Sequence, residues 1–437
     1  MLKCISRMGT AQASVGSSPK SPSRVPRILL GVCLAWLAVL TAVTYTYRGV
    51  RYPIGGGGET VAIMNSLLRD GTFANPFNAG WTGPSAFLPP LYPLFRAGMM
   101  KLFGPFGLTS LIIVTLLMHG LHAALLPSVS RLLFSRPGPG IWGALLVIAL
   151  PLIDVIHWDA IYVATGILIF YLCAARVFGA GAPAGLLRGA ALGLLAALLL
   201  LTNPVSALAF GPWLIALVWR RRFDVPVRRA AAGVLIAACL GCVPWTIRNY
   251  RQFGRFIFIR DNFGLVLYSS NNDCAAPTLL ENLRNGCNDR VHPIVNTSEV
   301  ELIRRLGEVE YNRNRLSVAL AWIRREPRRF LELTGARFVE FWFPSEAYSF
   351  WLITALSIPG ALWMVGKRCW TGAVLLAVCA LYPLVFYIAE TTPRYRYPIV
   401  WVSLLQAGYF LNEAGARLRR LRPSRALLPP ARKEAAG

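Results

Sequence analysis

The sequence is poor in charge, and acidic residues are its scarcest charged type. Only 15% of the 437 residues are Asp, Glu, Lys or Arg, whereas soluble domains carry about 25%. There are 20 acidic against 45 basic residues, and only four histidines. With 55% hydrophobic residues and a mean hydropathy of +0.50, the composition excludes a water-soluble globular protein. An acid in so apolar a chain therefore needs a physical explanation.

Long apolar windows recur along the chain. A hydrocarbon core about 30 Å thick requires about 20 apolar residues for each spanning helix. The windows are 28–47, 108–129, 140–156, 160–177, 186–201, 205–218, 230–245, 351–365, 371–388 and 399–411. This pattern predicts an all-α polytopic membrane protein with about ten transmembrane helices. No internal repeat is visible, which counts against transporter folds built from inverted repeats.

The net charge of +25 does not indicate nucleic-acid binding, because the basic residues follow the membrane topology. They gather before the first window, in alternate connections and in the last 20 residues or so. Cytoplasmic segments of membrane proteins carry this excess of Lys and Arg. We therefore expect both termini to be cytoplasmic and the bilayer, rather than nucleic acid, to be the partner of these charges.

The topology divides the chain into five parts. We expect a disordered cytoplasmic tail (1–27), seven spans with a long outer loop at 48–107 (28–245), an extracytoplasmic domain (246–350), three further spans (351–413) and a basic cytoplasmic tail (414–437). The extracytoplasmic domain is predicted to be α or α+β. Within it, Cys274 and Cys287 flank a polar stretch, and an oxidising compartment would permit a disulfide between them.

Local signals predict several elements outside the membrane. Residues 59–69 suit a short helix that ends at Asp70-Gly71, and residues 84–104 suit an amphipathic helix in the membrane interface. Ser298 and Glu301 match a capping box for a helix that runs to about Arg325. Pro327 would open the next helix. Residues 253–270 favour short strands or irregular structure.

Glu59 is the first candidate for chemistry. It follows four glycines (55–58) after the first apolar window. Its carboxylate could act as a general base or an ion ligand at a site beside the membrane. Alternatively, it could simply favour the start of the helix it opens, because acids are stabilised at helix N-termini.

Two further groups of polar residues lie in short outer connections. Asp154, His157 and Asp159 could bind an ion or a polar substrate, or could form a solvated hairpin tip. Arg394 and Arg396 break the charge rule that the other connections obey, and a bound anion would compensate them.

Arg248 and Arg251 form a second basic edge, which could bind substrate or could reach lipid headgroups. Together, these acids and arginines suit the displacement of a lipid phosphate from a sugar. Arginines would hold the departing phosphate, and a carboxylate would take the proton of the acceptor hydroxyl.

Three stretches resemble the GT-C superfamily of membrane glycosyltransferases. They are residues 59–104 (with SLLRDGTFANPF and TGPSAFLPPLYPL), residues 244–264 (PWTIRNYRQFGRFIFIRDNFG) with HPIVNTSEVELIRRLGEVEY and ARFVEFW downstream, and PRYRYPI from Pro393. The chain is most similar to bacterial relatives of dolichyl-phosphate-mannose protein mannosyltransferases and of lipid A aminoarabinose transferase.

The resemblance implies an inverting transferase of the bacterial cytoplasmic membrane with its active site on the outer face. The donor would be a polyprenyl-phosphate-linked sugar, and the acceptor a glycan, lipid or protein. Glu59 would be the base, and Arg394, with Arg396, would lie near the lipid phosphate. Many relatives have paired acids where Gly58 precedes Glu59 here, so a divalent-cation requirement stays open. The alternatives are a flippase or transporter of lipid-linked sugars and a non-catalytic assembly partner.

Overall fold

The computed structural model describes residues 31–32, 35–36, 58–77, 80–150, 159–179, 184–367 and 370–421. Within these residues all regular structure is helical, and β pairing is limited to two isolated bridges. The all-α prediction is therefore confirmed for the described part of the chain.

Five of the helical segments are long and apolar enough to cross a membrane. They are Leu91–Phe134 (α4 Leu91–Phe103, η1 Gly104–Phe106 and α5 Gly107–Phe134), α7 Ala160–Phe178, α10 Val225–Phe253, α17 Tyr348–Gly366 and Trp370–Ile388 (α18 Trp370–Leu381 and α19 Leu384–Ile388). Shorter apolar helices are α6 Gly138–Ala149, α8 Leu186–Thr202 and Pro204–Arg220 (η2 Pro204–Ser206 and α9 Ala207–Arg220).

Every predicted window from 108–129 onward coincides at least in part with a described helix, the last with α21 (Val400–Leu421). In the first window only residues 31–32 and 35–36 are described, and they are helical. The chain is thus a helical membrane protein by length and composition, and the count of ten spans remains a prediction.

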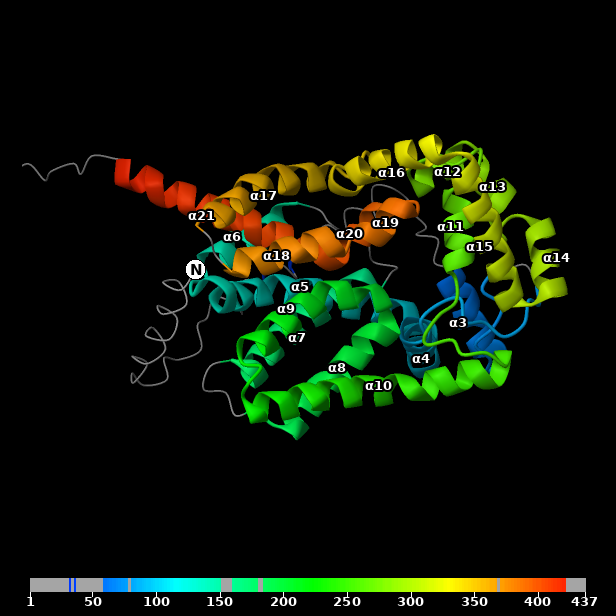
Figure 1. Cartoon of the computed structure of the whole chain (residues 1–437), viewed down its shortest axis with the longest axis horizontal. Coiled ribbons are helices and arrows are strands. Elements are labelled where there is room, and N and C mark those ends of the chain that lie inside the picture. The colour runs from blue at the N-terminus through cyan, green and yellow to red at the C-terminus, as the bar shows by residue number, and fades with distance from the viewer. Residues whose placement is uncertain are drawn as a thin grey trace, which may run out of the picture.

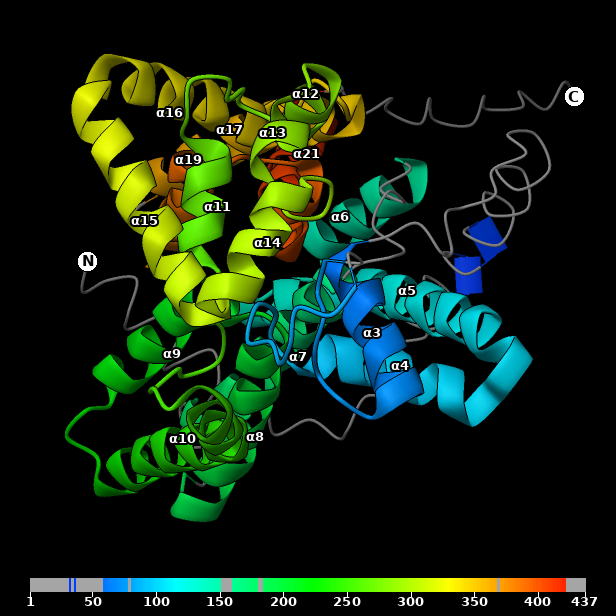
Figure 2. The ribbon, with the colours of Figure 1, turned by 90° about the vertical axis from the view of Figure 1, so that its right-hand side faces the viewer.

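The membrane-length helices run along the longest axis, and the polar helices gather at one end (Figure 1). Those at this end are α3 Glu59–Asp70, α11 Phe263–Ser270, α12 Leu279–Arg284, α13 Cys287–Val291, α14 Thr297–Leu306 and α15 Glu308–Arg325, and α16 Pro327–Trp342 leads back toward α17. Figure 2 looks onto this end, where α3 and α11 to α15 face the viewer. Helix α21 reaches the opposite end.

The core among the long helices is closely packed and rich in aromatic rings. The rings of Tyr171 and Trp213 stack with centroids 5.1 Å apart, and Trp401 meets Tyr171 edge to face at 4.8 Å. All three side chains are almost wholly buried. This core fixes the ends of the helices that carry the polar groups described below.

Helices α8 and α10 approach each other through glycine. A Cβ at Gly189 would lie 1.9 Å from the carbonyl oxygen of Ala230, and one at Gly233 would lie 2.3 Å from that of Leu186. Small residues at such contacts let two membrane helices meet backbone to backbone.

We therefore expect Gly189→Ala to push α8 and α10 apart and to cost about 1–3 kcal/mol in stability. The melting temperature of the purified chain in detergent should fall. Gly211 on α9 is the matched control, because a Cβ there would meet nothing within 4 Å. An equal fall for Gly211→Ala would contradict this account of the α8–α10 contact.

Sequence signals located most of the shorter helices correctly. Helix α3 ends at Gly71, whose φ of 67° is left-handed, and α16 begins at Pro327. The interfacial helix predicted within 84–104 corresponds to α4, which leaves Leu102 76% exposed. Exposed apolar surface of this kind suits contact with lipid.

Two local predictions were wrong, one of them only in part. Short strands or irregular structure were predicted for residues 253–270, and residues 254–262 have no regular structure. Phe263–Ser270, however, is helix α11, because Gly264 and Leu265 pack closely against Asn312 of α15. The capping residue of α14 is Asn296 rather than Ser298, since its Oδ1 accepts the N–H groups of Ser298 (2.9 Å) and Glu299 (3.4 Å). The described residues of 246–350 are thus α-helical and not α+β.

Candidate functional site

A cavity of about 370 Å³ lies where α3, α11 and α13 meet the ends of the long helices. Its ionisable lining comprises Glu59, Asp159, Arg260, His292, Glu390 and Arg394, together with tyrosines. Other walls are apolar and include Phe87, Leu265, Leu283 and Phe386. A pocket with apolar walls and a few convergent polar groups is the usual form of a ligand site.

Glu59 begins α3, and its carboxylate faces this cavity. Its side chain is 19% exposed, and Oε1 lies 3.6 Å from Nε2 of His292, which also lines the cavity. The first turn of a helix favours a negative charge, so α3 stabilises the carboxylate where it lines the cavity. The position of Glu59 in the first turn of α3 agrees with the helix-start interpretation, and its role as a base or ion ligand stays a prediction.

Asp159 lies at the start of α7 and interacts electrostatically with two arginines. Its Oδ2 accepts a hydrogen bond from Nδ2 of Asn203 at 3.2 Å. Burial raises the pKa of Asp159, while Arg394, Asn203 and Arg260 act in the opposite direction. Its predicted neighbours Asp154 and His157 lie outside the described residues.

Arg394 and Arg260 place two guanidinium groups on the cavity wall. Arg394 donates from Nη2 to the hydroxyl of Tyr395 at 3.1 Å and lies over that ring, 4.8 Å from its centroid. It also interacts electrostatically with Asp159 and Glu59. Burial lowers the pKa of Arg260, whereas Tyr395 and Asp159 raise it.

Arg260 was missed as a site residue in the sequence. It sits in the stretch FIFIRD, where a single cation follows an apolar run, and that interruption was the available signal. The structure adds it to the cavity beside Arg394 and Asp159.

The other arginines predicted to bind substrate lie elsewhere. Arg396 is 1% exposed and donates to the carbonyl of Trp342 (2.7 Å) and to Oγ of Ser403 (3.2 Å). Arg251 is exposed on α10. Neither residue lines the cavity.

Arg248, on α10, holds the loop between α3 and α4 through two hydrogen bonds. It donates from Nη1 to the carbonyl of Ser85 at 2.6 Å and from Nη2 to the carbonyl of Phe73 at 2.8 Å. These bonds hold the loop that follows α3, so Arg248 supports the cavity without lining it.

Glu390 links the segment before Arg394 to helices α11 and α12 through two hydrogen bonds. Its Oε2 accepts from Nδ2 of Asn282 at 2.9 Å, and its backbone N–H donates to Oγ of Ser270 at 2.8 Å. Burial raises the pKa of Glu390, and Asn282, Arg337 and Arg394 oppose that shift. Arg337, fully buried on α16, donates to the carbonyls of Ser270 and Ile388 and so ties the same segment to α11.

Glu308, the first residue of α15, joins that helix to the loop between α3 and α4, and this contact is called the junction below. Its Oε1 accepts the backbone N–H of Ala86 at 2.6 Å. Burial raises its pKa from the ordinary 4.5 to about 7, with Asp261 adding to the shift and Ser85, Ala86 and Arg248 opposing it.

We expect this junction to weaken as the pH rises from about 4.5 to about 7. The folded chain holds the Glu308 proton more tightly than the unfolded chain does, so the associated stability is complete below that range and is lost across it. The melting temperature of the wild type should fall over this range, and that of Glu308→Gln should fall less. Equal slopes for the two proteins would contradict this assignment.

No protein-family model matches the chain, and neither does any curated protein. The fold and site therefore define the class: a helical membrane protein with a cavity of mixed charge and apolar walls at one end of its long helices. Within the described ranges, no three His, Cys, Asp or Glu side chains are grouped as a metal ion would require.

Proposed function

We propose that this chain is a membrane glycosyltransferase that moves a sugar from a polyprenyl-phosphate donor to an acceptor hydroxyl. The observation that carries the proposal is the lining of one cavity, where the carboxylate of Glu59 accompanies the guanidinium groups of Arg260 and Arg394. The resemblance of the sequence to the GT-C superfamily supports the same activity.

The proposed reaction needs one base and a stabilised leaving group. The bond between the anomeric carbon and the phosphate oxygen breaks while the acceptor oxygen attacks from the opposite side, so the anomeric configuration inverts. Glu59 takes the acceptor proton. Arg260 and Arg394 bind the phosphate, on which negative charge develops, and the lipid leaves as polyprenyl phosphate.

The remaining cavity residues suit supporting roles in this reaction. Asp159 interacts with both arginines and would hold them in place. A volume of about 370 Å³ is within the common range for small-molecule sites, so the sugar phosphate would occupy the cavity and the long lipid tail would remain in the bilayer. We propose ten spans, cytoplasmic termini and an outward-facing cavity in a bacterial cytoplasmic membrane.

Mass spectrometry of envelope lipids, glycans and proteins from cells with and without the chain tests this function. The proposal predicts that one class of glycoconjugate loses a single sugar residue when the chain is absent. A flippase would instead move a polyprenyl-phosphate sugar across sealed vesicles without altering it. Unchanged glycoconjugates, or transport without transfer, would contradict the proposal.

A further inference from the structure

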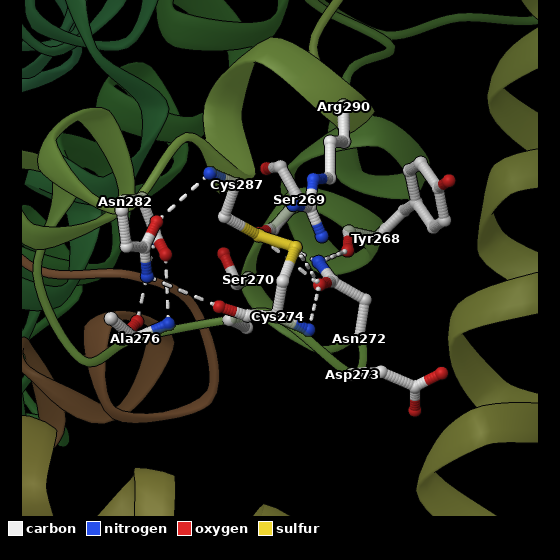
Figure 3. The surroundings of a disulfide bond; sticks show 12 residues. Tyr268, Ser269, Ser270, Asn272, Asp273, Cys274, Ala276, Asn282, Cys287 and Arg290 are labelled. Atoms are coloured by element: carbon white, nitrogen blue, oxygen red, sulfur yellow. Dashed lines mark hydrogen bonds between the residues drawn. A yellow bond between two sulfur atoms is a disulfide. The ribbon is translucent and has the colours of Figure 1, made fainter.

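A disulfide closes the segment that forms one wall of the cavity. Cys274 and Cys287, 13 residues apart, are bonded, which confirms the pairing expected from the sequence (Figure 3). Cys287 begins α13, and His292 follows its last residue. Within and just beyond the loop, Leu279, Leu283 and His292 face the cavity.

Helix α13 needs this support because it has only five residues. Helices so short are not stable alone in water. The disulfide fixes its first residue, and Oδ1 of Asn285 accepts the N–H of Cys287 at 2.8 Å. On the other side, the N–H of Leu279 donates to the carbonyl of Thr391 at 3.3 Å, which ties the loop to the segment carrying Arg394.

The hydrogen bonds of His292 determine which ring nitrogen carries the proton. Its Nδ1 accepts the backbone N–H of Ile294 at 3.2 Å, so in the neutral ring the proton is on Nε2. Burial lowers the pKa of His292, while the acids Glu59 and Glu299 raise it. The Nε2 atom lies 3.6 Å from Oε1 of Glu59, just beyond hydrogen-bond distance.

We propose that His292 is a positioning residue for Glu59 and that the Cys274–Cys287 disulfide holds it there. The inference rests on the proposed role of Glu59 as the base. The N–H of Nε2, 3.6 Å from Oε1, restrains the carboxylate electrostatically and leaves Oε2 to meet the acceptor hydroxyl. The disulfide keeps α13, and with it the imidazole, on the cavity wall.

Carbodiimide labelling of Glu59, followed by peptide mass spectrometry at pH about 7, tests this without a substrate. The variants are His292→Phe, which keeps a ring, His292→Gln, which keeps an N–H donor, and the double variant Cys274→Ser/Cys287→Ser. Carbodiimides react with carboxyl groups that they can reach, and a carboxylate that the N–H no longer restrains meets the reagent more readily. Labelling of Glu59 should rise several-fold in His292→Phe and in the double variant, and should return near the wild-type level in His292→Gln.

Transfer assays on the same full-length proteins separate this inference from the proposed function. In His292→Phe, kcat should fall about 10- to 100-fold, with the KM for the donor nearly unchanged, and His292→Gln should recover most of it. Wild-type labelling in His292→Phe would overturn the inference even if Glu59 proves essential for transfer. The expected labelling pattern in a wild type without transferase activity would uphold the positioning and reject the function.

Discussion

Replacing Glu59 with glutamine should abolish sugar transfer while leaving the protein folded and inserted. The change removes the proton acceptor but keeps the shape of the side chain at the start of α3. General bases contribute about 10²- to 10⁴-fold to the rate, so we expect a loss of at least that order in kcat. Donor binding should persist, because Arg260 and Arg394 are unchanged.

The measurement is transfer by the purified variant, together with its melting temperature and its binding of polyprenyl phosphate. Glu301→Gln provides the matched control, because Glu301 is an exposed acid on α14 outside the cavity lining. It should transfer at the wild-type rate. Full activity in Glu59→Gln would reject Glu59 as the base.

Arg394→Ala should cause the second large loss of sugar-transfer activity. The guanidinium of Arg394 lines the cavity beside Asp159 and Tyr395, where it would bind the departing phosphate. Removing one such group typically lowers kcat about 10²- to 10³-fold, and we also expect a higher KM for the donor. Arg394→Lys should recover only part of the lost kcat, since lysine lacks the planar fork of donors.

Arg396→Ala is the informative contrast to Arg394→Ala. It would leave the buried hydroxyl of Ser403 without this donor, at about 1–3 kcal/mol, whereas the carbonyl of Trp342 would keep the hydroxyl of Thr354 as a donor. Its melting temperature should therefore fall more than that of Arg394→Ala. A loss of donor binding in Arg396→Ala without loss of stability would reverse the assignment of the two arginines.

The long helices were predictable because the apolar sequence of each segment alone determines them. A bilayer imposes a length of apolar sequence on each span, so the windows from 108–129 onward fall on helices without any tertiary information. The disulfide was predictable because the topology expected from the sequence puts Cys274 and Cys287 on the outer side, where an oxidising compartment would permit the bond. The prediction of strands or irregular structure for 253–270 failed at residues 263–270, because contact with α15 decides the structure of α11.

The composition of the cavity was only partly predictable. Arg394 and Arg396 share one motif, but two residues on a helix turn the side chain by about 200°, so one lines the cavity and the other enters the core. Arg260 and His292 come from distant parts of the sequence and reach Asp159 and Glu59 only through the packing of α11 and α13. The local sequence pattern does not predict which residues from distant parts of the chain come into contact.

Release of polyprenyl phosphate by the purified chain tests the central claim most directly. The chain would be placed in a bilayer with the polyprenyl-phosphate lipids and acceptors extracted from cells that lack it, in which both accumulate. We predict that polyprenyl phosphate appears in equal amount to a product of inverted anomeric configuration, and that Glu59→Gln yields neither. Donor lipid recovered intact with the wild-type chain, or a product of retained configuration, would contradict the account.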